Sequence, residues 1–147
     1  MDILRFSGQY AFLSNFYWYY SQRLKRKTTV EHRFQADKAI TVVERDWVLD
    51  SASPATAKAR GGRVDLRDDW DTFRMLAMEY WISDKFTAGT LLANALLATG
   101  DALLVHGNTH GDTFWGKVGG TGSNHLGRLL MRQRDYLKSV RLPAELT

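Results

Sequence analysis

Helix start and stop signals divide much of the chain after Thr28 into helical segments. Ser53-Pro54 is a cap followed by proline at the first helical position, and Gly61-Gly62 ends that segment. A longer helix, with apolar residues at helical spacing, is expected to begin at a cap formed by Asp71. These signals predict a fold that is built mainly from helices.

The rest of the chain completes this pattern. Residues 1–20 are rich in Phe and Tyr and are interpreted as short strands of a small sheet. Residues 90–99 are apolar on nearly all sides, which indicates a buried helix, and residues 102–105 are a candidate strand. A loop of low apolar content follows, and an amphipathic helix is expected over 125–138. The fold class predicted is α+β, mainly helical with a small β-sheet.

Length and composition narrow the class of protein. A chain of 147 residues with 44% hydrophobic residues suits one domain, predicted to span 1–147. No apolar run approaches the about 20 residues that a membrane helix needs. The chain has no cysteine, which excludes disulfides and thiolate chemistry and favours the cytoplasm. The net charge of +4 favours an anionic partner, either a nucleic acid or a phosphorylated small molecule.

The stretch "TTVEHRFQADKA" at 28–39 raises a question about its polar residues. On a helix, Glu31, Gln35 and Lys38 fall within an arc of about 60°, so they share one face. The opposite side carries Arg33 and Asp37, so it is not an apolar face either. The polar stripe is therefore a candidate for a face that is turned toward the protein.

Two interpretations of this stripe stay open. Thr28 and Glu31 have the spacing of a capping box, in which both side chains bond free amides at the helix start. Lys38 would then be an ordinary solvated lysine. Alternatively, the three groups line a functional cleft, since buried ionisable groups need partners or a purpose.

The loop over 106–124 contains patterns that resemble known binding motifs but do not meet their requirements. "GDTFWGK" has P-loop spacing, but Val118 stands where a Ser or Thr must bind magnesium. His106 and His110, with Asp112 nearby, have the composition of a metal site. Two histidines four residues apart converge when they lie on a helix, and this glycine-rich segment is not helical. We therefore expect no metal and no cofactor.

The same loop has plainer features that remain candidates. A glycine-rich segment leading into a helix capped by Ser123 or Asn124 is expected to present free backbone amides to an anion. Asp112 is either a functional carboxylate or the first residue of an Asx turn. Trp115 is either a stacking platform or a core anchor.

Five segments, taken together, resemble the NADAR, or YbiA-like, family. They are, in chain order, "FSGQYAFLSNFY", "TVEHRFQADKA", "DDWD", "DKF" and "GDTFWGKVGGTGSNHLGRLLMRQRDYL". The resemblance covers nearly the whole chain, and five segments in the right order are far more specific than one. One departure is His106, at a position where the family often has glutamate, which bears on substrate choice.

The resemblance implies an N-glycosidase that cleaves the bond between base and ribose. The implied substrates are early, phosphorylated intermediates of riboflavin biosynthesis or, as in some relatives, ADP-ribosylated guanine in nucleic acid. No membrane and no obligate protein partner are expected. The implied catalytic residues are Glu31, Lys38 and Asp112. The implied substrate-binding residues are Ser14, Asn15, Gln35, Trp70, Trp115, Gly116 and Asn124.

This chemistry suits the residue types. Breaking an N-glycosidic bond builds positive charge on the sugar and negative charge on the base, so carboxylates and a proton donor are useful. Two mechanisms stay open: Lys38 forms a Schiff base with the ribose while Glu31 shuttles the proton, or a carboxylate activates water directly. Two other functions stay open as alternatives. One is a non-catalytic module that binds ADP-ribose or nucleotides, and the other is a basic nucleic-acid-binding protein.

Overall fold

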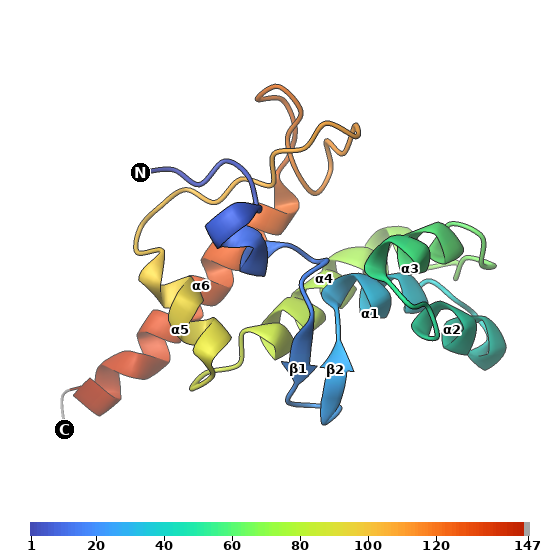
Figure 1. Ribbon diagram of the computed structural model, residues 1–147, viewed down its shortest axis with the longest axis horizontal. Coiled ribbons are helices and arrows are strands. Elements are labelled where there is room, and N and C mark those ends of the chain that lie inside the picture. Colours follow the sequence, from blue (N-terminus) through green and yellow to red (C-terminus); the bar gives the residue numbers. More distant parts are fainter. Residues whose placement is uncertain (146–147) are drawn as a thin grey trace. The chain divides into compact units, whose positions relative to one another are not determined.

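The computed structural model describes residues 1–145, with side chains through 141. The fold class is α+β, as predicted: helices dominate the described residues, together with a small antiparallel sheet (Figure 1). The chain divides into two compact units, which we call unit 1 (Met1–Ser14 and the chain from Phe86 onward) and unit 2 (Asn15–Lys85). The expected single domain over 1–147 stays a prediction. Among the described residues, no helix has the length and apolar character needed to cross a membrane.

Unit 2 begins with a hairpin. Strand β1 (Tyr19–Ser21) pairs with β2 (Arg26–Thr28) in antiparallel register, with Tyr19 opposite Thr28. The Tyr19 hydroxyl donates to a carboxylate oxygen of the buried Asp84 at 2.7 Å, which ties the hairpin to the last helix of the unit. The expected strands at the very start of the chain are therefore wrong in place. The sheet lies over 19–28 instead.

Four helices complete unit 2: α1 (Val30–Ala36), α2 (Val42–Leu49), α3 (Pro54–Gly61) and α4 (Trp70–Lys85). The predicted limits of α3 are confirmed, and the Ser53 side chain accepts from the Thr56 N–H as its cap. The predicted start of α4 is wrong by two residues, because a cap at Asp71 would begin the helix at Thr72 and it begins at Trp70. Asp71 lies inside the first turn, where an acidic side chain complements the helix dipole, and does not cap the helix.

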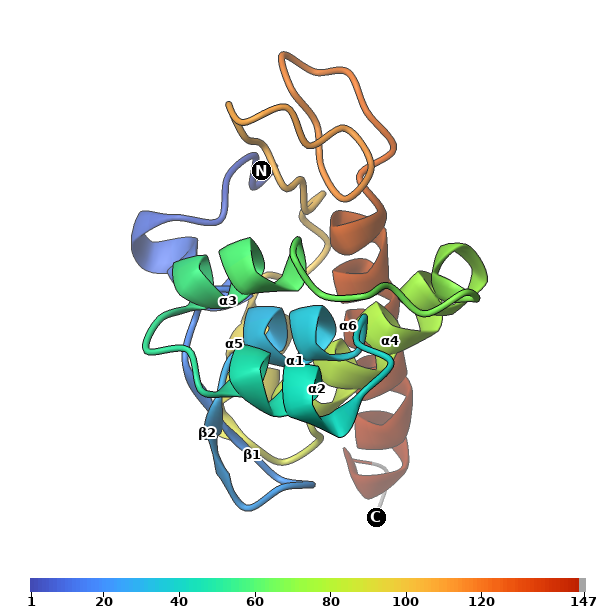
Figure 2. The same ribbon diagram turned by 90° about the vertical axis from the view of Figure 1, so that its right-hand side faces the viewer.

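Helix α1 is the centre of unit 2. It packs against α2, α3 and α4, and every one of its residues is buried (Figure 2). A helix enclosed on three sides has no solvent face, so its polar side chains must find partners inside the protein. This enclosure explains why the sequence of α1 lacks a clean apolar stripe.

The described part of unit 1 contains a 3-10 helix, η1 (Gly8–Leu13), two helices, α5 (Leu91–Ala98) and α6 (His125–Glu145), and the loop over 106–124. The η1 turn lies where strands were expected. Helix α5 is only partly buried, since Leu91 is 87% exposed and Ala93 and Leu96 are its buried residues, so the prediction of a buried helix is wrong. The candidate strand over 102–105 is reduced to one parallel bridge between Leu104 and Ile3.

Candidate active site

The start of α1 places the first two predicted site residues. Thr29, and not Thr28, is the cap: its hydroxyl accepts from the His32 N–H at 3.0 Å. The predicted capping box is therefore wrong. Glu31 is 7% exposed and Gln35 is 5% exposed, and the Gln35 amide donates to a Glu31 carboxylate oxygen at 2.8 Å. The polar stripe is turned into the protein.

The surroundings of Gln35 are unusually tight. The amide oxygen of Gln35 is buried without a hydrogen-bond partner among the described residues. Gly61, the last residue of α3, lies against this side chain so closely that a Cβ there would overlap it. An uncompensated buried acceptor costs stability, so its presence calls for an explanation, and a role in the site is one such explanation.

Lys38 lies just beyond the end of α1, in a turn and not on the helix. Its ammonium is half-buried, 5.9 Å from the centre of the Phe34 ring and 5.8 Å from that of Trp70. Burial lowers the pKa of Lys38 below the usual lysine value, while the charge of Glu31 partly opposes this shift. The prediction that Lys38 shares a helix face with Glu31 and Gln35 is therefore wrong, because α1 ends at Ala36; Lys38 interacts with Glu31 through its charge from the turn that follows.

The remaining unit 2 candidates have clear structural contacts. Trp70 is 7% exposed and packs on Phe34 with ring centroids 5.0 Å apart, which is largely a core position. The carbonyl oxygen of Asn15 accepts from the Glu31 N–H at 3.1 Å, so the backbone of Asn15 holds the helix start. Unit 2 thus contains five of the predicted site residues: Asn15, Glu31, Gln35, Lys38 and Trp70.

Sequence reasoning missed two groups of unit 2. Asp37, the C-cap of α1, accepts from Arg45 at 2.7 Å and from the indole of Trp81 at 2.7 Å. Lys85 on α4 is 2% exposed, and burial lowers its pKa to about 7. A buried lysine leaves no local signal in a sequence, because lysine at a helix end usually complements the dipole from the surface.

Unit 1 carries the other candidates in the loop over 106–124. One carboxylate oxygen of Asp112 accepts from the N–H groups of Phe114 at 3.2 Å and Trp115 at 2.9 Å. Asp112 therefore forms the Asx turn that the sequence offered as one alternative. Ser14, the remaining unit 1 candidate outside the loop, follows η1 and donates its N–H to the Ala11 carbonyl.

The prediction of free backbone amides at the start of α6 is wrong. The N–H groups of residues 123–126 donate to carbonyl oxygens of the loop itself, those of Thr113, Gly116, Phe114 and Trp115. The side chain of Asn124 is equally occupied, since it accepts from the His106 N–H and donates to the Leu104 carbonyl. The loop folds back over the helix start and takes the donors that an anion would need.

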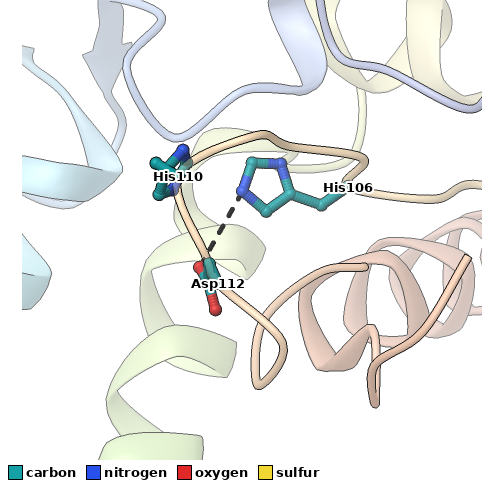
Figure 3. A group of neighbouring side chains, drawn as sticks. All are labelled: His106, His110 and Asp112. Carbon is teal, nitrogen blue, oxygen red and sulfur yellow. Dashed lines mark ion pairs between the residues drawn. The ribbon is translucent and has the colours of Figure 1, made fainter. Parts of the chain in front are cut away.

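The histidines that the sequence argument kept apart are brought together. Figure 3 shows His106, His110 and Asp112 on one turn of the loop, with ligand atoms that all lie within 4.8 Å of one another. The two imidazoles approach each other without a helix because the chain bends at residues 109–110 and turns back on itself there. Gly111 in this turn has φ 88°, which an L side chain rarely adopts.

A profile of the NADAR domain matches residues 5–138, which is most of the chain. The chain belongs to the NADAR family. Within the family it is similar to N-glycosidase YbiA of Escherichia coli, at 38% identity over 136 residues, covering 89% of this chain and 84% of that protein. The NMR structure of Escherichia coli YbiA matches with a TM-score of 0.83 and 32% identity, covering 97% of this chain and 86% of that one.

Other relatives of this NADAR chain are longer proteins. It is 40% identical over 111 residues to a riboflavin biosynthesis protein of Vibrio vulnificus, covering 74% of this chain and 30% of that protein. It is 39% identical over 132 residues to the chloroplastic riboflavin biosynthesis protein PYRR of Zea mays, covering 80% of this chain and 21% of that protein. The chain thus spans less than a third of these two relatives.

Proposed function

We propose that this NADAR chain is an N-glycosidase that hydrolyses the bond between base and ribose in phosphorylated N-ribosides. The observation that carries the proposal is the buried Glu31 carboxylate coupled to the Lys38 amine, whose pKa is lowered by burial. Such a pair supplies a proton carrier and a nucleophile in one place. The name of the Escherichia coli relative, an N-glycosidase, supports the reaction class.

The proposed substrate is an early intermediate of riboflavin biosynthesis. Relatives named riboflavin biosynthesis proteins support this class of small molecule. Its heterocycle would need a flat apolar surface, and its phosphate would need cationic or N–H donors. The cytoplasmic location inferred from the sequence stays part of the proposal.

In the proposed mechanism, the ribose ring opens and the neutral Lys38 amine attacks the anomeric carbon. A bond forms between the lysine nitrogen and this carbon, and the bond to the base nitrogen breaks as that nitrogen takes up a proton. Glu31 carries the proton between the two nitrogens. Water then adds to the lysine Schiff base, releases the sugar as an aldehyde and regenerates the amine.

This mechanism has a defined pH dependence. The attacking form of Lys38 is the neutral amine, so turnover rises with pH as the ammonium loses its proton. Because burial lowers the pKa of Lys38, the inflection lies below the usual lysine value. A rate profile that rises only in the range of an exposed lysine contradicts the role of Lys38.

Within unit 1, Asp112, Trp115 and Gly116 stay proposed functional residues of the loop over 106–124. The change Asp112→Asn tests the first of these roles sharply. Asparagine keeps an oxygen that accepts from the Phe114 and Trp115 N–H groups, so the Asx turn persists while the charge is lost. A fall in turnover then reports on the carboxylate, and unchanged turnover reduces Asp112 to a turn residue.

The experiment that tests the activity measures release of free base. Wild-type protein and Glu31→Gln are incubated with a phosphorylated ribosylaminopyrimidine and with ADP-ribosylated guanine, and the products are identified by mass spectrometry. Release by wild type alone supports the N-glycosidase. Equal background release by both proteins, together with saturable binding of ADP-ribose, identifies a non-catalytic binding module.

A second experiment separates the two mechanisms. Borohydride added during turnover reduces a Schiff base to a stable secondary amine, which adds the mass of the sugar to the Lys38 peptide. An active sample that shows no adduct on Lys38 excludes the covalent route. Direct hydrolysis by a carboxylate-activated water then remains.

One feature of unit 2 supports the alternative substrate, ADP-ribosylated guanine within a nucleic acid. The hairpin of unit 2 exposes Trp18 and Tyr20 beside a basic cluster over 23–27. Cationic side chains bind phosphates and aromatic rings stack on unpaired bases. If the substrate is ADP-ribosylated guanine within a single strand, affinity falls steeply with salt, and changing Trp18 to Ala weakens binding of the strand but not of the free nucleotide.

A further inference from the structure

The turn over 106–112 in unit 1 gathers two imidazoles and a carboxylate (Figure 3). The Nε2 atom of His106 lies 4.0 Å from Oδ2 of Asp112, and the rings of His106 and His110 have centroids 6.2 Å apart. Ligand atoms around a tetrahedral zinc ion are about 3.3–3.5 Å apart, given bonds of about 2.0–2.1 Å. The side chains need to close by only about 1 Å to meet this geometry.

The carboxylate is oriented by the loop. Oδ1 of Asp112 accepts two backbone N–H groups, and these bonds direct Oδ2 toward His106. The Asn108 side chain accepts from the Asp112 N–H at 3.0 Å and donates to the Asp112 carbonyl at 2.9 Å. The position of Asp112 is therefore set by four hydrogen bonds to its own loop, which is the kind of support that metal ligands require.

Both backbone groups and the ring of His106 have contacts that fix its position. Its N–H donates to Asn124 at 2.9 Å, and its carbonyl accepts from the Lys117 N–H at 3.0 Å. Its ring stacks on the buried Phe6 at 5.7 Å with an interplanar angle of 22°. His110, by contrast, is exposed, and among the described residues its ring contacts that of His106.

We propose that His106, His110 and Asp112 bind a divalent transition-metal ion of the zinc class. Two imidazoles and one carboxylate are a donor set that zinc accepts, with the remaining coordination position open to water or another ligand. Magnesium and calcium prefer all-oxygen sites, so the imidazoles select against them. The proposal does not depend on the N-glycosidase activity, because its readout is metal binding.

The test titrates zinc into the metal-stripped chain, prepared without a histidine tag, and follows the heat of binding. Wild type is expected to bind one equivalent, and His110→Ala and His106→Ala are each expected to weaken binding tenfold or more. The chain has four histidines, and His125→Phe is the matched control because His125 lies in the same unit outside the cluster and phenylalanine keeps the ring that packs on Phe114. It is expected to bind zinc within about threefold of wild type.

Cobalt provides a second, spectroscopic measurement of metal binding. Cobalt bound by the cluster gives a visible absorption band that zinc abolishes and that His110→Ala lacks, while a large excess of magnesium leaves the band unchanged. Circular dichroism spectra that overlay wild type show that His110→Ala is folded. The proposal is overturned if wild type shows no saturable binding, if His110→Ala binds as tightly as wild type, or if His125→Phe loses binding to the same extent.

Discussion

The polar residues of α1 and those of the loop over 106–124 are held in different ways. In α1, the side chains of Glu31 and Gln35 are buried and bond each other, enclosed by neighbouring helices. In the loop, Asp112 is half-exposed and its bonds run to backbone groups. Helix packing sets the environment of the first group, whereas loop backbone geometry sets that of the second.

The difference shows which chemistry each region suits. Burial in α1 and the turn after it perturbs an amine, because desolvation disfavours the charged form of Lys38. The loop leaves its imidazoles and carboxylate near solvent, where an ion can enter. The first region is suited to proton transfer and nucleophilic attack, and the second to binding.

The largest expected effect removes the perturbed amine. Changing Lys38 to Ala is expected to lower kcat by on the order of 10³-fold or more, while the melting temperature stays near that of wild type. The matched control is Lys58→Ala on α3. The positive charge of Lys58 contributes to the lowered pKa of Lys38. The control variant is expected to retain kcat and to move the pH profile to higher pH. Comparable loss of kcat in both variants contradicts a specific role for Lys38.

The next effect concerns Lys85, the other buried lysine of unit 2. Its pKa is about 7 in the folded protein and 10.5 in an unfolded chain. Between these values the unfolded state binds more protons, so the free energy of unfolding rises with pH, by roughly 2 kcal/mol from pH 7 to 9. Urea titrations at several pH values measure this slope.

The change Lys85→Met supplies the control for that slope. Methionine fills a similar volume without a titrating group, so the rise between pH 7 and 9 is expected to flatten. The Tyr17 ring lies 5.5 Å from the ammonium and offsets part of the cost of burial. An identical slope in wild type and variant shows that other groups produce it.

A smaller effect tests the tight packing around Gln35. Changing Gly61 to Ala places a Cβ onto the Gln35 side chain and is expected to cost about 1–2 kcal/mol of unfolding free energy. Gly62, the next residue, is the matched control: its φ is −74°, and a Cβ there meets Ala59 at an ordinary 3.5 Å. Gly62→Ala is expected to stay within about 0.5 kcal/mol of wild type. Equal costs for the two variants contradict the close approach at Gly61.

The smallest effect tests the loop. Changing Asn108 to Ala removes the side-chain bonds to the backbone of Asp112 and is expected to cost about 1 kcal/mol. The control is Asn94→Ala on α5, an exposed asparagine of the same unit, which is expected to change stability little. Hydrogen exchange measured over residues 106–124 should rise in the first variant alone. Unchanged exchange there shows that backbone bonds suffice to hold the loop.

Local signals were sufficient for the parts of the fold that depend on local chemistry. Proline and glycine set the limits of α3, because their effect on backbone angles acts within one or two residues. The mixed polarity of α1 left a solvated and an inward-facing polar stripe both open, and the complete burial of the helix decides for the second. The α+β class was predicted from such local patterns, whereas the inward orientation of Glu31 and Gln35 was one of two alternatives that the structure decided.

Other features depended on partners that are distant in the sequence. The carbonyl oxygens of residues 113–116 occupy the amides at the start of α6, and no local rule predicts that a loop will satisfy that helix end. The convergence of His106 and His110 depends on a turn held by Asn108, with Asn124 bonded to the His106 N–H. Helix period and capping are properties of neighbouring residues, whereas the environments of Lys38 and Lys85 are set by packing between helices.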